Sequence, residues 1–158
     1  MRSRPKRLLE FEGEIPDELV RAFEGLLAEG SGWVNLVPEV IEPDDVARAS
    51  LLGRHGPTAM GTVMAAHGWR RKRIRLGVMH PQGRITPKEL TKLGLAIPEG
   101  WRLISSHARK GMVLEPLAQA GVREVLGWTK ELCLALCVME TTGKVRAEIY
   151  EPRLSPSK

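Results

Sequence analysis

The chain has 158 residues, of which 42% are hydrophobic and 27% charged, and its net charge is +5. This length and composition predict one folded domain with its own core and exclude a disordered chain. The longest apolar run, residues 132–139, is too short to span a bilayer. The basic N-terminus lacks the apolar stretch of a signal peptide, so we expect a cytoplasmic protein.

Charge is unevenly distributed along the chain. Residues 1–9 are basic, whereas residues 10–45 hold 11 acidic residues and one basic residue. Residues 46–158 are basic again, with 19 basic and 8 acidic side chains. The basic part therefore has an acidic neighbour in its own chain, which offsets some of its positive field.

The domain boundaries follow from where a periodic apolar pattern begins and ends. Residues 1–9 lack such a pattern and are expected to form a flexible basic arm. Residues 10–152 are expected to form a single domain, and residues 153–158 a loose C-terminal tail.

The first predicted helix spans residues 15–30. Pro16 suits its first turn, Gly30 suits its C-terminal end, and its apolar residues share one face. A strand follows at residues 33–40, in which Pro38 lacks an N–H donor and indicates an edge strand or a strand end.

The rest of the domain is predicted as alternating strands and helices. In chain order these are a helix at 42–53, strands at 58–66 and 71–80, a helix at 86–94, two strands within 102–116, a helix at 117–140 and a strand at 145–152. Thr86, Pro87 and Glu89 form a capping box with proline at the first helical position. Short connections favour antiparallel strand pairs. We therefore predict an α+β fold, a mainly antiparallel β-sheet with helices packed on one face.

The most basic stretch, residues 69–80, is predicted to be one of these strands. Alternate side chains of a strand face opposite ways, so the arginines share the face opposite to the apolar residues. The last strand has the same pattern. If the two strands are neighbours, the open face carries a candidate polyanion site of Arg71, Arg73, Arg75, Lys144 and Arg146. The alternative is an ordinary solvated sheet face. Tyr150 is the one aromatic side chain predicted there, which is few for stacking nucleic-acid bases.

Two further surfaces are candidates for binding. His80, Arg84 and Lys88 surround the N-terminus of the helix at 86–94, where an anion could bind, although the cap itself uses part of that terminus. Leu134 and Val138 make the last turns of the helix at 117–140 apolar all round. We expect the first helix to cover them, and self-association through them is the alternative.

The two cysteines, Cys133 and Cys137, are four residues apart in a predicted helix. This spacing matches neither a redox motif nor a zinc motif, and we expect both thiols to be reduced and buried. The four histidines are not spaced as metal ligands, and nucleotide-binding and hydrolase motifs are absent. We therefore expect no metal, no cofactor and no assignable catalytic residue.

The order of helix, three strands, helix, two strands and helix resembles that of small secretion-chaperone domains, while the last strand and the basic charge depart from it. Our leading hypothesis is a non-catalytic interaction domain, adaptor-like or chaperone-like, that binds another protein. A homodimer of this chain is a further option. The alternatives are a nucleic-acid-binding domain and a small enzyme with a histidine in a basic site. An acidic first helix lying across the arginines would argue against nucleic acid. A buried His107 beside Glu115 or Glu148 would favour an enzyme.

Overall fold

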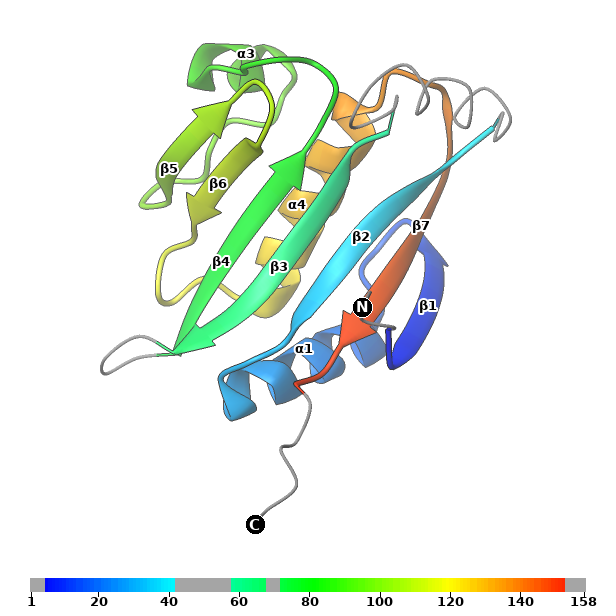
Figure 1. The fold of residues 1–158 in the computed structure, drawn as a ribbon, viewed down its shortest axis with the longest axis vertical. Coiled ribbons are helices and arrows are strands. Elements are labelled where there is room, and N and C mark those ends of the chain that lie inside the picture. Colours follow the sequence, from blue (N-terminus) through cyan, green and yellow to red (C-terminus); the bar gives the residue numbers. More distant parts are fainter. Residues whose placement is uncertain (1–4, 42–57, 68–71, 153–158) are drawn as a thin grey trace.

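The computed structural model describes residues 5–41, 58–67 and 72–152. The elements in this part of the chain are β1 (Arg7–Glu12), α1 (Asp17–Glu29), β2 (Trp33–Val40), β3 (Met60–His67), β4 (Lys72–Met79), α3 (Pro87–Lys92), β5 (Arg102–His107), β6 (Gly111–Glu115), α4 (Val122–Leu136) and β7 (Thr141–Tyr150). The strands form one seven-stranded sheet in the order β1-β7-β2-β3-β4-β6-β5, and every neighbouring pair is antiparallel (Figure 1). The predicted α+β fold is confirmed.

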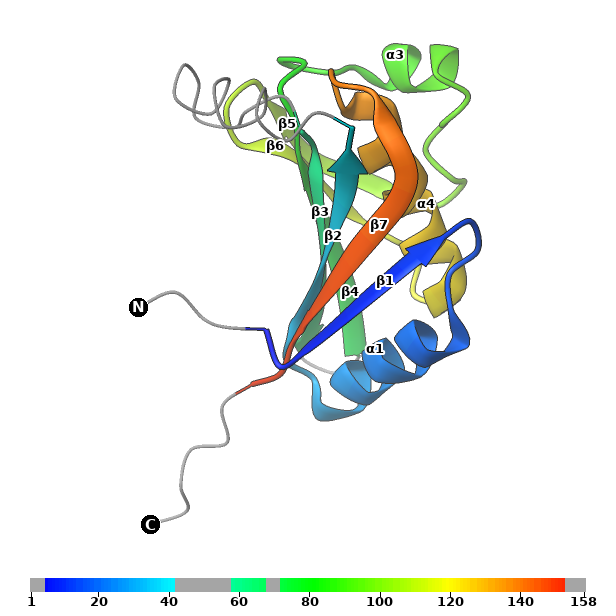
Figure 2. The ribbon, with the colours of Figure 1, turned by 90° about the vertical axis from the view of Figure 1, so that its right-hand side faces the viewer.

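The described helices pack on one face of the sheet, as Figure 2 shows edge-on. The core lies between them and the sheet, with Leu19 and Phe23 of α1 and Leu126 of α4 fully buried. At Gly61 of β3 an added Cβ would lie 2.6 Å from Thr129 Cγ2 and 2.7 Å from Cys133 Sγ of α4. Glycine therefore lets α4 approach the middle of the sheet closely, and the opposite face carries no described helix.

Strand β1 is an element that sequence analysis missed. Residues 7–9, assigned to the flexible arm, are its first half, and it pairs with β7 along its whole length. Phe11 points to the core and is buried. The turn that follows β1 is held by α4, because buried Lys130 donates a hydrogen bond to the carbonyl of Gly13 at 2.5 Å.

Strand β2 lies inside the sheet, so the edge position suggested by Pro38 is wrong. β2 pairs with β3 from Trp33 to Leu36 and with β7 along most of its length. Pro38 comes after the last residue paired with β3, next to an irregularity in the pairing with β7. Pro38, which has no N–H donor, therefore lies beyond the end of the β2–β3 pairing, where a proline is tolerated.

The two clearest helix predictions differ in outcome. At α3, the backbone N–H of Thr86 donates to Glu89 Oε2 at 2.6 Å, and the Glu89 N–H donates to Thr86 Oγ1, which confirms the capping box. At α4, the helix is shorter than the predicted range of 117–140 because Gly121 and Cys137 are both extended. The predicted helix at 42–53 lies outside the described residues.

Candidate binding surface

The face of the sheet opposite the helices is termed the open face. Residues that pair directly across antiparallel strands point to the same side. Tyr150, Trp33, Met64 and Arg75 are paired in this way on β7, β2, β3 and β4, and form a row across the open face. Glu115 of β6 extends this central row, with its carboxylate 4.0 Å from the Arg75 guanidinium.

Trp33 and Tyr150 supply an aromatic pair at one end of the central row. Their ring centroids are 4.9 Å apart and their planes differ by 11°, so the rings are stacked. Partial burial, with repulsion from Glu148, raises the pKa of Tyr150. Its hydroxyl is therefore protonated at neutral pH and can donate a hydrogen bond. Sequence analysis had placed Tyr150 alone on this face, although the alternation of β2 puts Trp33 opposite buried Val34 and could have found it.

The other end of the row is an arginine cluster, defined here as Arg73, Arg75, Arg102 and Glu115. Arg102 lies 3.0 Å from the Glu115 carboxylate, Arg73 3.9 Å and Arg75 4.0 Å. The three arginine side chains are 47% to 71% exposed, whereas Glu115 is 19% exposed. Three positive charges therefore surround one negative charge, which leaves the cluster with a net charge of +2.

The predicted polyanion site is only partly assembled. Arg73 and Arg75 lie on the open face, and Arg71 lies outside the described residues. The condition that the last strand neighbours β4 is wrong, because β2 and β3 lie between β4 and β7. Lys144 and Arg146 are therefore three strands away from the nearest arginine of the cluster.

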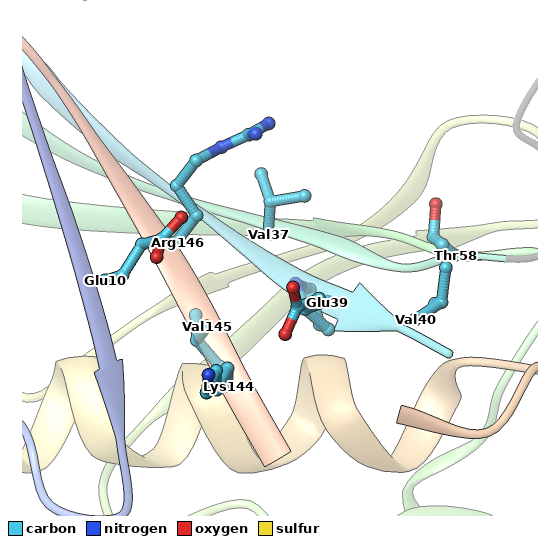
Figure 3. Close-up of a pocket in the computed structure, with 9 residues that line it drawn as sticks. Glu10, Val37, Glu39, Val40, Thr58, Lys144, Val145 and Arg146 are labelled. Atoms are coloured by element: carbon cyan, nitrogen blue, oxygen red, sulfur yellow. The ribbon is translucent and has the colours of Figure 1, made fainter. Parts of the chain in front are cut away.

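Acidic side chains oppose these two cations on β7. In the register of β1 and β7, Lys144 lies opposite Glu12 and Arg146 lies opposite Glu10. The Arg146 guanidinium is also 3.8 Å from the Glu148 carboxylate. Figure 3 shows Arg146 directed away from α4, above Glu10, at a pocket of about 380 Å³. This side of the open face is net acidic, with four carboxylates to two cations, whereas the arginine cluster is net basic. The carboxylates are those of Glu10, Glu12, Glu39 and Glu148.

The acidic helix α1 does not cover the arginines. It packs on the core face, where its Asp17 pairs with Arg123 of α4, and its Glu18 pairs with Arg7. The acidic part of the chain reaches the open face through β1 instead. The condition that would have argued most directly against nucleic acid is therefore not met.

The proposed anion site before α3 is occupied by the chain itself. The Glu89 carboxylate accepts from the Thr86 N–H, and this hydrogen bond lowers the pKa of Glu89. Arg84 and Lys88 are exposed beside it, and His80 is buried at the end of β4. The binding role of these three residues stays a prediction.

The surroundings of His107 are not those expected of an enzyme. His107 is exposed at the turn between β5 and β6, and its Nδ1 accepts from the Arg109 N–H at 3.1 Å. Glu115 is at the far end of β6 from His107, and Glu148 is five strands away. Within the described ranges, no three histidine, cysteine, aspartate or glutamate side chains come together as a metal site requires.

The last turn of α4 combines buried and exposed apolar residues. Leu134 is half-buried against the core, while Val138 lies beyond the helix and is 61% exposed. Helix α1 contacts the first turn of α4, through Asp17 and Arg123, and does not reach this end (Figure 2). The expected cover by the first helix is therefore wrong. The thiol of Cys133 is buried and that of Cys137 half-buried, and neither forms a disulfide.

Comparison with protein-family models, with curated proteins and with solved structures gives no match to this chain. No described helix has the length and apolar character needed to cross a membrane.

Proposed function

We propose that this protein is a non-catalytic binding domain that recognises another protein through its open face. The central row carries the proposal, since tryptophan, tyrosine, methionine and arginine are the side chains enriched at protein interfaces and their energetic centres. Trp33 and Tyr150 form a rigid aromatic pair, and Met64 beside them is 38% exposed. A flexible methionine next to rigid rings can adapt to a partner surface.

The size of the open face fits a stable protein interface. Seven strands at about 4.8 Å spacing give a width of about 29 Å, and their average length of about seven residues gives about 25 Å. The resulting area of about 725 Å² approaches the roughly 800 Å² that each partner buries in a standard complex.

Site-specific photo-crosslinking in a lysate of the source cells tests this proposal. A photoreactive phenylalanine analogue at position 64 is expected to give discrete protein adducts. The same analogue at Glu131, an exposed residue of α4 on the helix side, is the matched control. Equal adducts from both positions, or adducts to nucleic acid alone from position 64, would contradict the proposal.

A second candidate is single-stranded nucleic acid, which the aromatic pair specifically favours. Base stacking on Trp33 or Tyr150 and phosphate contacts from Arg73 and Arg75 would combine as in other sheet-face readers. Because single strands lose affinity with a slope of about −0.7 per phosphate contact, two contacts predict a slope near −1.4 in log K against log salt. Tight binding of a labelled oligonucleotide with this slope would favour nucleic acid over a protein partner.

A further inference from the structure

We infer that the arginine cluster is the docking point for a carboxylate-bearing, acidic segment of the protein partner. This inference rests on the proposed function and gives it a chemistry. The cluster combines an excess of positive charge, unused hydrogen-bond donors and an adjoining hollow on the open face.

The donors of the cluster exceed its acceptors. Three guanidinium groups carry about 15 N–H donors, whereas the Glu115 carboxylate offers about four acceptor positions. Glu115 is the least exposed member and gathers the arginines at its two oxygens, at 3.0 to 4.0 Å. The outward N–H groups of Arg73, Arg75 and Arg102 are thus directed to incoming anions, and a carboxylate matches the forked geometry of a guanidinium.

Hollows flank the cluster on both sides. One, of about 350 Å³, is lined by Trp33, Met64 and Arg75. The other, of about 220 Å³, lies toward the helix side, because Leu27 of α1 and Val122 of α4 line it. Both hollows include Arg73 and Glu115. An acidic segment can therefore place carboxylates on the cluster and apolar or aromatic side chains beside it. From Tyr150 to Arg102 the row spans about 24 Å, which about seven extended residues cover.

Charge on the rest of the face favours a peptide over a nucleic acid. Glu10, Glu12 and Glu148 line the β1 and β7 side of the face. A nucleic acid carries a charge on every nucleotide and would place phosphates near these carboxylates. A protein segment can concentrate its acidic residues over the cluster alone, which is the pattern of charge complementarity in specific complexes.

Fluorescence anisotropy with a defined probe tests the inference. The probe is a fluorescein-labelled seven-residue peptide with three glutamates beside a tryptophan and a leucine, and the control peptide has glutamines in place of the glutamates. We expect the glutamate peptide to bind about tenfold more tightly than the control peptide, and less tightly as salt rises.

Two variants of equal charge locate the binding. Arg73→Gln with Arg75→Gln brings the cluster from +2 to zero and is expected to lower affinity about tenfold. Arg21→Gln with Lys92→Gln removes the same charge from exposed positions on α1 and α3 and is expected to keep the affinity unchanged. Glu115→Gln raises the cluster charge to +3 and is expected to increase affinity, whereas a purely structural glutamate would give a decrease.

The outcomes separate this inference from the proposed function. No binding of the glutamate peptide, equal losses in both double variants, or weaker binding by Glu115→Gln would overturn the inference. A labelled oligonucleotide that binds more tightly than the peptide and displaces it would also overturn the inference. If adducts from position 64 persist in those cases, the open face still binds a protein and only the acidic chemistry is wrong.

Discussion

Two glycines on adjacent strands give a sharp test of which face the helices cover. Gly61 of β3 points to α4, where an alanine Cβ would lie 2.6 Å from Thr129 and 2.7 Å from Cys133. Gly77 of β4 points to the open face, where the nearest atom to an added Cβ is the Met112 carbonyl oxygen at 3.6 Å. Overpacking costs about 1–3 kcal/mol, while replacing a strand glycine by alanine gains about 0.5–1 kcal/mol through the unfolded chain.

Gly77→Ala is therefore expected to match or exceed the wild type in stability, and Gly61→Ala to be about 1–3 kcal/mol less stable than Gly77→Ala. For a domain of this size, each kcal/mol of lost stability lowers Tm by roughly 2–4 °C. Urea unfolding of both variants and the wild type, with m-values compared, measures it. Equal stability of the two variants would refute the close packing of α4 on β3.

Three smaller predictions concern the helix side. Burial raises the thiol pKa of Cys133 and Cys137, so in the native protein both should react slowly with a thiol reagent below pH 9. Both should react rapidly once the protein is unfolded. Fast labelling of both thiols in the native protein would show that α4 packs differently. The pKa of Glu89 is lowered by its hydrogen bond to Thr86, so the cap stabilises α3 fully at pH above the ordinary carboxyl range. This stabilisation is lost as pH falls through the lowered pKa. NMR of the α3 amides should show this acid transition in the wild type and not in Glu89→Gln. If Val138 drives self-association, light scattering should show Val138→Lys to be monomeric at concentrations where the wild type is not, and a monomeric wild type would remove that hypothesis.

The elements with strong local signals could be predicted from sequence. The capping box at Thr86 and the alternation in β2 and β4 are local properties, and the structure has them where the sequence places them. Strand β1 was missed because it is short and its charged start resembles a flexible arm. Its pairing with β7, 130 or more residues away in sequence, leaves no local trace.

The binding surface depends on strand order, which local patterns do not determine. Alternation correctly put Arg73 and Arg75 on the face opposite the core, but their neighbours come from β3 and β6, not from β7. Trp33 joins Tyr150 only because β2 and β7 are adjacent. Glu115 was considered solely as a partner for His107, and its contacts with three arginines appear only when β4, β5 and β6 are assembled.

Methyl NMR of [¹³C-methyl]methionine-labelled protein tests the central claim, that the open face is the binding surface, within one sample. Met64 and Met79 lie on the open face and are 38% and 39% exposed, whereas Met112 is buried beneath the helices. Met139 is partly buried and lies in the connection between α4 and β7. On addition of the unlabelled three-glutamate peptide, we predict the largest shift at the Met64 methyl signal, a smaller shift at Met79, and none at Met112 and Met139. Shifts at Met139 alone, or no methyl shift at saturating peptide, would contradict the account.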